Sequence, residues 1–265
     1  MLMTRGVLDG EPKRWSCLCA YDGTEFAGWQ KQPNGHAVQD KIEEALEKIF
    51  GSPVRTIGSG RTDAGVHAIG QVFHFDAPWM HPLQSLLQAM RTYFPTGISP
   101  LELKEETNDF HALLSARGKR YRYRLFLGWA MPETDRFVYS LKEKKVNLAA
   151  MQEAAKYFIG EHDFSAFSVS RGGDEKLESK VRKVWKVEVL KEKEEVQVVV
   201  EGSGFLYKMV RSMVGALLDV GMGKLKTEEI EIFLKSKIRT ERVVSAPAKG
   251  LCLEKVFYHL PNKKG

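Results

Sequence analysis

Residues 119–127, KRYRYRLFL, alternate basic side chains with aromatic and aliphatic ones over most of their length. A period of two predicts a β-strand, because successive side chains of a strand point to opposite faces of the sheet. The two faces would carry Arg120, Arg122 and Arg124, and Tyr121, Tyr123 and Leu125. The basic face suits phosphates, and an aromatic ring on the other face suits stacking on a base. A solvated basic strand with two tyrosines in the core is the alternative.

Other segments supply helices and strands without regular strand–helix alternation. Apolar residues at three- and four-residue spacing predict a helix at 37–50, and Asn147 and Gly160 suit the ends of a helix at 148–159. Further helices are expected at 83–93, 206–220 and 227–235, and further strands at 15–21, 54–57, 71–76, 181–190, 195–201 and 250–258. This order predicts an α+β fold with mainly antiparallel sheets flanked by helices.

The length of 265 residues favours two domains over one or three. Pro95, Gly97 and Pro100 interrupt the chain before the charged stretch KEETND at 104–109. We place the domain boundary there, which predicts an N-terminal domain of residues 1–108 and a C-terminal domain of residues 109–265.

The composition indicates a folded, basic protein. Hydrophobic residues make up 43% of the chain and charged residues 28%, and the formal net charge of +6 would attract a polyanion such as nucleic acid. The cysteines, Cys17, Cys19 and Cys252, show neither CxxC nor zinc spacing, so a reducing compartment is expected. No secretory or membrane-spanning apolar run is seen, and we expect a cytoplasmic protein.

The segment 58–67, GSGRTDAGVH, concentrates polar side chains between glycines that allow tight backbone turns. It joins two expected strands and would present Asp63 at a sheet end. A carboxylate near a guanidinium such as that of Arg61 stays ionised, as a nucleophile or general base must be. A turn in which Asp63 only caps backbone amides is the alternative.

Spacing argues against nucleotide hydrolysis and metal catalysis. The segment GSGRTDAG lacks the Lys-Ser/Thr of a phosphate-binding P-loop, and no dinucleotide-binding GxGxxG follows a strand. The possible metal ligands share no helical i, i+4 face; they are His67, His74, His81 and Asp76. We therefore expect no metal and no nucleotide cofactor.

Two cations, Lys208 and Arg211, lie one turn apart near the expected start of the helix at 206–220. Cations at this end oppose the helix dipole, which favours anions. Their placement makes sense if an anion docks between them, either a phosphate or the Asp63 carboxylate. A helix that begins earlier, with both side chains in solvent, is the alternative.

Six segments, in order, resemble the bacterial tRNA pseudouridine synthase A family over almost the whole chain. They are YDGTEFAGWQKQ at 21–32, GRTDAGVHAIGQVFHF at 60–75, FHALLSARGKRYRYRLF at 110–126, GEHDFSAFS at 160–168, FLYKMVRSMVGALLDVG at 205–221 and APAKGLCLEKVFY at 246–258. The second segment is the most specific.

The resemblance implies that Asp63 is the essential carboxylate, which attacks the target nucleotide or removes a sugar proton. Arg61 would hold the backbone of the flipped nucleotide and pair with Asp63, Tyr121 would stack on the target base, and Arg211 would form a salt bridge with Asp63. It further implies a pseudouridine synthase fold with the active-site cleft between two subdomains, a homodimer, and action on uridines at positions 38 to 40 in the anticodon arm of tRNA, without metal or organic cofactor.

Two departures from the family pattern affect the expected substrate range. The family usually has an arginine where this chain has Leu113 or Leu114, and an Asn-rich segment where it reads MRTYFP at 90–95.

Two rival functions are weighed against the synthase. A non-catalytic tRNA-binding module would explain the charge but not Asp63, and a metal-dependent nuclease would need an acidic cluster.

Overall fold

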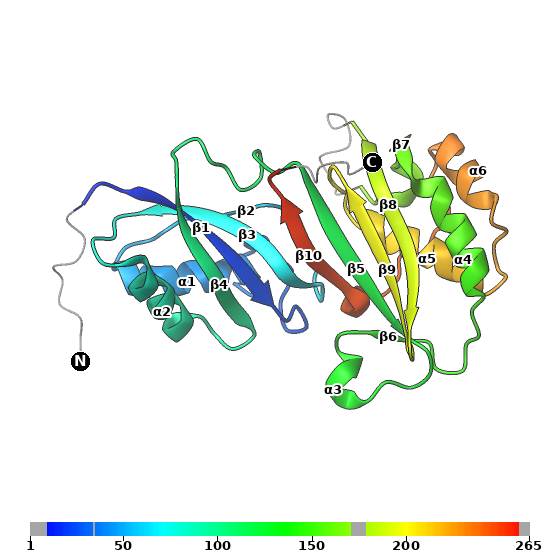
Figure 1. Ribbon diagram of the computed structural model, residues 1–265, viewed down its shortest axis with the longest axis horizontal. Helices are drawn as coiled ribbons and strands as arrows, with labels where there is room; N and C mark the ends of the chain where they lie inside the picture. Colours follow the sequence, from blue (N-terminus) through cyan, green and yellow to red (C-terminus); the bar gives the residue numbers. More distant parts are fainter. Residues whose placement is uncertain (1–9, 34, 171–178, 260–265) are drawn as a thin grey trace. The chain divides into compact units, whose positions relative to one another are not determined.

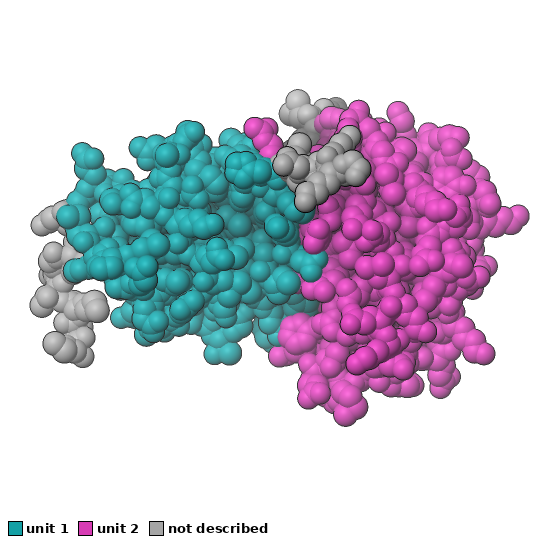
Figure 2. All heavy atoms as spheres, viewed as in Figure 1, with its two compact units in different colours: residues 1–116, 253–265 teal, residues 117–252 magenta. Residues whose placement is uncertain are grey.

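The computed structural model describes residues 10–33, 35–170 and 179–259. The chain forms two compact units, residues 1–116 with 253–265 and residues 117–252 (Figure 2). These units place 109–116 and 253–265 with the N-terminal part. Whether residues 1–108 and 109–265 fold as independent domains stays a prediction.

Unit 1 is built on an antiparallel sheet in which β1 (Lys13–Tyr21) lies between β3 (His67–Ala77) and β4 (Ile98–Glu106). A short strand, β2 (Ile57–Gly58), pairs with the other edge of β3. Two helices, α1 (Val38–Phe50) and α2 (Leu83–Tyr93), complete this unit (Figure 1).

The core of unit 1 forms where the apolar stripe of α1 meets the sheet. Ile42, Leu46 and Phe50 are buried along the helix, and the ring of Phe50 lies 6.1 Å from that of Phe75 on β3. The helix ends at Gly51, whose left-handed conformation (φ 70°) lets its N–H donate to the Glu47 carbonyl at 2.8 Å.

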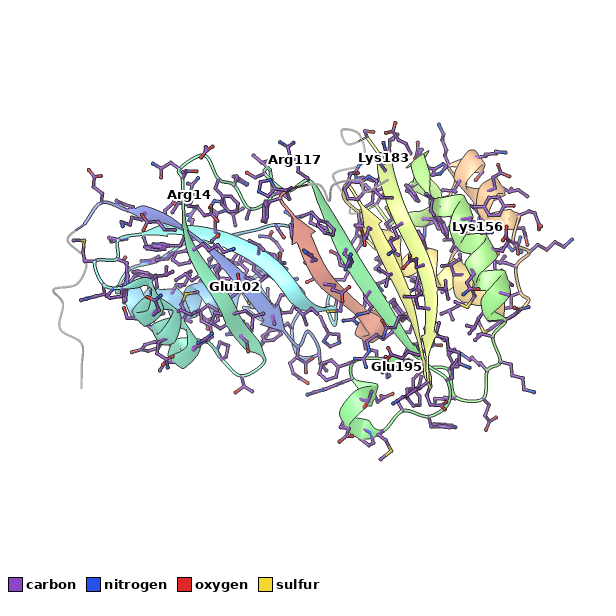
Figure 3. All side chains as sticks on the ribbon, viewed as in Figure 1. Arg14, Glu102, Arg117, Lys156, Lys183 and Glu195 are labelled. Atoms are coloured by element: carbon purple, nitrogen blue, oxygen red, sulfur yellow. The ribbon has the colours of Figure 1, made fainter. Side chains whose placement is uncertain are left out.

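The strand β4 corrects the prediction that the chain is interrupted around residues 95–100 before a charged stretch. Residues 98–106 form an edge strand. In this strand Glu102, labelled in Figure 3, and Lys104 are exposed, while Leu103 is buried. An edge strand tolerates Pro100 because one side of its backbone needs no partner, and its charges discourage pairing with other chains. Propensity alone therefore missed a strand that pairing with β1 stabilises.

Unit 2 contains an antiparallel sheet in the order β5-β9-β8-β7, with β6 parallel to β5. Helices α4, α5 and α6 pack beside this sheet (Figure 1). The elements are β5 (Gly118–Phe126), α3 (Pro132–Asp135), β6 (Tyr139–Ser140), α4 (Leu148–Ala155), β7 (Gly160–Asp163), β8 (Val181–Glu192), β9 (Glu195–Gly202), α5 (Met209–Gly221) and α6 (Glu229–Ser236). The last strand, β10 (Leu251–Phe257), begins in unit 2 and ends in unit 1.

The predicted α+β class with mainly antiparallel pairing is confirmed. Asn147 caps α4, because its side chain accepts from the Ala150 N–H at 3.1 Å. Gly160 instead starts β7, since a 3₁₀ turn at Lys156–Phe158 follows the helix. The strand expected at 54–57 is reduced to β2, and α5 starts later than residue 206. Among the described residues, no helix is long and apolar enough to cross a membrane.

Candidate active site

The loop between β2 and β3 carries Asp63, and a buried glutamine holds the start of this loop. Ser59 donates from its hydroxyl to Gln71 Oε1 at 2.7 Å, and Gln71 Nε2 donates to the Gly60 carbonyl at 3.0 Å. Gln71 is fully buried on β3, so its amide exchanges solvent for these loop contacts. The loop backbone is thus tied to the sheet directly before Arg61.

Thr62 anchors the loop between the two candidate residues. Its Oγ1 lies 2.8 Å from the Tyr21 hydroxyl, and its carbonyl accepts from the Trp29 N–H at 3.1 Å. Gly28 allows this approach: a Cβ there would lie 2.6 Å from the Thr62 carbonyl oxygen. Because Thr62 is buried, the chain turns its neighbours outward, and Arg61 is exposed while Asp63 is half-buried.

The turn after Asp63 is closed by its own backbone, since Val66 N–H donates to the Asp63 carbonyl at 3.1 Å. Gly65 adopts φ 76°, a left-handed conformation that favours glycine. Arg61 donates from Nε to Gln30 Oε1 at 3.1 Å, which orients the exposed guanidinium. These contacts hold the backbone on both sides of the Asp63 carboxylate.

A buried histidine at the end of the same loop joins it to the turn after β1. His67 Nδ1 accepts from the Gly23 N–H at 3.0 Å. Asp22 Oδ1 lies 3.2 Å from the same nitrogen and accepts from the Thr24 N–H at 3.0 Å. His67, weighed as a metal ligand, therefore takes part in a structural clamp. In the described part of the chain, no group of His, Cys, Asp and Glu residues is arranged to hold a metal ion.

Tyr121 and Tyr123 lie on the inner face of β5, and the predicted division of this strand into two faces is confirmed. Tyr123 is fully buried, and its hydroxyl donates to the Pro247 carbonyl at 2.8 Å, so this tyrosine belongs to the core. Tyr121 is 7% exposed and contacts the ring of Phe205 edge to face, with centroids 5.4 Å apart. The core alternative thus holds for Tyr123, and Tyr121 remains the candidate for stacking.

The opposite face of β5 is less basic than its sequence suggests. Arg120 bonds Glu201 at 2.7 Å, and Arg124 bonds Glu195 through two nitrogens at 2.9 and 2.5 Å. The Arg124 guanidinium lowers the pKa of the Glu195 carboxyl. The neighbouring strand β9 thus supplies carboxylates that neutralise this face, which the alternation within one strand does not reveal.

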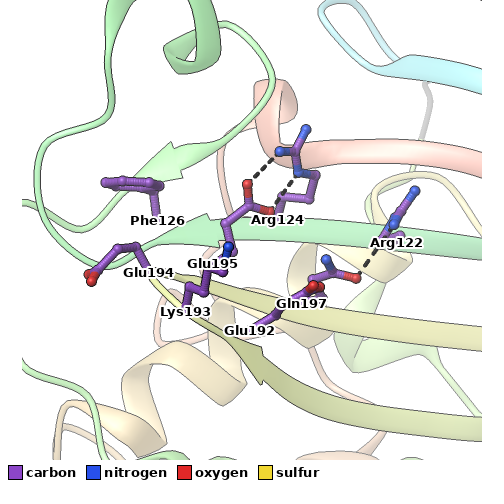
Figure 4. Close-up of a pocket in the computed structure, with 8 residues that line it drawn as sticks. All are labelled: Arg122, Arg124, Phe126, Glu192, Lys193, Glu194, Glu195 and Gln197. Atoms are coloured by element: carbon purple, nitrogen blue, oxygen red, sulfur yellow. Dashed lines mark hydrogen bonds and ion pairs between the residues drawn. The ribbon is translucent and has the colours of Figure 1, made fainter.

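Figure 4 shows a pocket of about 500 Å³ at the end of the β8–β9 hairpin. Its lining mixes acidic and basic side chains and includes the Arg124–Glu195 pair; the residues are Arg122, Arg124, Phe126, Glu192, Lys193, Glu194, Glu195 and Gln197. No residue of the predicted site lines it, and its charges are largely compensated. We assign it no role.

Arg211 lies in the first turn of α5. The helix starts at Met209, so the alternative of an earlier start is wrong, and Lys208 precedes it with a left-handed backbone (φ 59°). Arg211 Nε donates to the Ala246 carbonyl at 2.8 Å, while Ala246 N–H donates to the Arg211 carbonyl at 2.9 Å. The segment before β10 therefore orients this guanidinium.

Unit 1 thus brings Arg61 and Asp63 together on one loop, and unit 2 holds Tyr121 and Arg211. Sequence reasoning did not single out Tyr21, Thr62 and Gln71 as supports of the loop, and it weighed His67 only as a metal ligand. The amide of Gln71, at a position where the strand faces the core, was the available signal for one of them.

A sequence profile described as tRNA pseudouridine synthase matches residues 18–113 and 154–259, which include Arg61, Asp63 and Arg211 but not Tyr121. The chain is 41% identical to the tRNA pseudouridine synthase A of Clostridium kluyveri over 93% of this chain and 100% of that protein. The proteins of the same name from Syntrophotalea carbinolica and Exiguobacterium sibiricum are 42% and 38% identical, over 91% and 96% of this chain and 94% and 99% of theirs. The chain belongs to the tRNA pseudouridine synthase A family.

Proposed function

We propose that the protein converts uridine to pseudouridine at positions 38, 39 and 40 in the anticodon stem-loop of tRNA, with Asp63 as the catalytic carboxylate. As a family member, the protein is a tRNA pseudouridine synthase, an isomerase. The observation that supports Asp63 is that its loop is anchored. The buried contact between Thr62 and Tyr21 fixes the backbone directly before Asp63.

The reaction moves the bond between the sugar and the uracil ring from N1 to C5, so no atom is gained or lost overall. A carboxylate assists either by attacking the target nucleotide or by removing a sugar proton. Both roles need an ionised group at a defined position, and holding that group in place lowers the barrier. The anchored turn after Thr62 supports the defined position, and the proposal includes no metal or organic cofactor.

The other candidate residues have complementary roles in this proposal. Arg61, exposed and oriented by Gln30, holds the backbone of the flipped nucleotide. Tyr121 stacks on the target base once the base has left the helical stack. Arg211 is assigned, as the family resemblance implies, to pair with the carboxylate of Asp63.

The substrate and setting also follow from the family and the charge. A net charge of +6 suits tRNA, which is held mainly through phosphates and shape. We propose a cytoplasmic homodimer. Leu113 and Leu114 are 46% and 75% exposed, so this chain presents apolar side chains where relatives usually offer an arginine, and its contacts to tRNA phosphates differ there.

The test measures pseudouridine in unmodified tRNA that carries uridines at positions 38 to 40. Wild type, Asp63→Asn and Asp109→Asn are compared with and without EDTA at equal RNA binding; Asp109 is an exposed carboxylate of unit 1 outside the loop. Product from wild type and Asp109→Asn, but not from Asp63→Asn, supports a metal-independent synthase. Bound tRNA without product from any protein would favour the non-catalytic tRNA-binding module, and activity lost only under EDTA would revive the metal-dependent reading.

A further inference from the structure

A second basic group lies on the same face of β5 as Tyr121. Lys119 precedes Tyr121 by two residues, so their side chains point the same way, with Cα atoms about 7 Å apart. Lys119 faces Gly202 on β9 in the ladder. A Cβ at Gly202 would lie 3.2 Å from the ring of Phe205, which also contacts Tyr121. Lys119 thus belongs to the cluster that contains the candidate stacking tyrosine.

The ammonium group of Lys119 is partly withdrawn from water, and no carboxylate of the described residues compensates it. Burial is the larger cause that lowers the pKa of Lys119 to about 8, and the positive charge of Arg182 lowers it further. Among the described residues, no carboxylate contributes to this balance. Other lysines behave differently: Glu43 bonds Lys31 at 3.1 Å and raises its pKa.

Arg182 lies on the same side of the sheet as Lys119. Gly202 faces Val184 on β8, and Arg182 precedes Val184 by two residues on that strand. Cross-strand neighbours share a face, so Val184 and Arg182 point in the same direction as Lys119. Arg182 Nε would lie 4.0 Å from a Cβ at Gly204, in the turn that leads to Phe205.

The hydrogen bonds of Arg182 orient it without neutralising it. Its Nη1 donates to the carbonyls of Ser179 and Val181, at 2.6 and 2.8 Å, and neither acceptor carries a charge. Among the described residues, no acceptor is bonded to its Nε or Nη2. Within the described part of the chain, the guanidinium is therefore held by one nitrogen and leaves two nitrogens without an acceptor.

Among the residues that the structure describes, the neighbouring strand β7 adds no anion to this pair. His162 faces Arg182 from β7, with its Nε2 3.1 Å from the Ile159 carbonyl. The carboxylate of Asp163 accepts from Ser165 N–H at 2.9 Å and lies 3.9 Å from Lys237. Two like charges held together, one of them partly buried, destabilise the folded protein unless a bound anion compensates them.

We propose that Lys119 and Arg182 form a phosphate-binding site beside Tyr121, and that it holds a phosphodiester of the RNA strand next to the target uridine. This inference rests on the proposed function, because it takes Tyr121 as the residue that stacks on the base. A guanidinium and an ammonium suit one phosphate together: the first offers a planar pair of donors and the second a compact charge. The site would fix the strand on one side of the flipped nucleotide.

The test compares tRNA binding and pseudouridine formation for wild type, Lys119→Met, Lys119→Arg and Arg182→Gln. Lys183→Met is the matched control: Lys183 follows Arg182 on β8, so it points to the other face, and Figure 3 labels it. Removing a phosphate contact should weaken tRNA binding about tenfold and reduce the slope of log affinity against log salt by about 1. Lys119→Arg should keep most of the affinity, and Lys183→Met should behave as wild type.

Two further measurements separate binding from a structural role. In steady-state kinetics over a range of tRNA concentrations, Lys119→Met should keep kcat within about twofold while its KM for tRNA rises. The phosphate contact would stabilise the ground state and the transition state equally, so its loss affects binding and not the chemical step. Its melting temperature without tRNA should rise, because one of two neighbouring cations is removed; a structural role would lower it.

The outcomes also distinguish this site from the proposed function. Wild-type pseudouridine formation with unchanged affinity and salt slope in Lys119→Met would overturn the phosphate site and leave the function standing. Absence of pseudouridine formation by wild type would overturn the function, and with it the place given to this site. Inorganic phosphate that stabilises wild type but not Lys119→Met, with unchanged tRNA affinity, would assign the pair to a free anion and overturn the proposal.

Discussion

The hydrogen bond between Tyr21 and Thr62 gives the sharpest test of how the loop positions Asp63. The two oxygens lie 2.8 Å apart, and the residues are 4% and 5% exposed, so neither hydroxyl can turn to water. In Thr62→Val, the Tyr21 hydroxyl still lies 3.4 Å from Gln71 Nε2, which limits the loss to about 1 kcal/mol. In Tyr21→Phe, Thr62 Oγ1 keeps no other partner among the described residues, and we expect a loss of about 2 to 3 kcal/mol.

The double variant should cost about as much as Tyr21→Phe alone, which corresponds to a coupling of about 1 kcal/mol. Urea denaturation followed by tryptophan fluorescence measures the free energy of unfolding, and Trp29 is a local reporter because its N–H bonds the Thr62 carbonyl. Tyr93→Phe is the matched control, since Tyr93 is 48% exposed at the end of α2.

Activity provides the second readout of the same bond. A shift of about 1 Å in a catalytic group costs on the order of 100-fold in rate, so both single variants should lose roughly 10- to 100-fold in kcat. The KM for tRNA should change little, because Arg61 remains exposed beside the loop. Additive losses of stability in the double variant, or wild-type kcat in a destabilised single variant, would refute the reasoning.

Three further predictions follow from buried contacts. Burial lowers the pKa of His74 to about 4 from an ordinary 6.5, so the unfolded chain takes up this proton first as pH falls. The folded protein should therefore lose about 2 kcal/mol of stability between pH 7.5 and pH 5. Urea denaturation of His74→Gln should show a smaller loss over the same range. Gly23→Ala should cost about 2 kcal/mol and reduce kcat, because its Cβ would lie 2.1 Å from the Val66 carbonyl oxygen; unchanged denaturation and activity would contradict this. Tyr123→Phe should lose about 1 kcal/mol with its bond to Pro247 but keep wild-type pseudouridine formation, and a large drop in kcat would give Tyr123 a role in the site.

Local pattern by itself determined much of the fold. The helix at 38–50 and the strand β5 follow from apolar periods of 3.6 and two residues, because burying one stripe or one face requires those spacings. The resemblance of six segments led to the family and to Asp63 as a candidate, since family motifs are local in sequence. The local sequence was also enough to predict Asn147 as a helix cap, because the cap uses the side chain of this residue alone.

Tertiary structure alone decided features that depend on strands distant in sequence. Ile98–Glu106 became a strand because β1 pairs with it, although proline and charges argue against it. The arginines of β5 meet Glu195 and Glu201 only through the register of β9. The bond between Tyr21 and Thr62 and the neighbouring charges of Lys119 and Arg182 likewise join separate segments. No local period records these contacts, because the free energy of a hydrogen bond or ion pair depends on where the folded chain places its two partners.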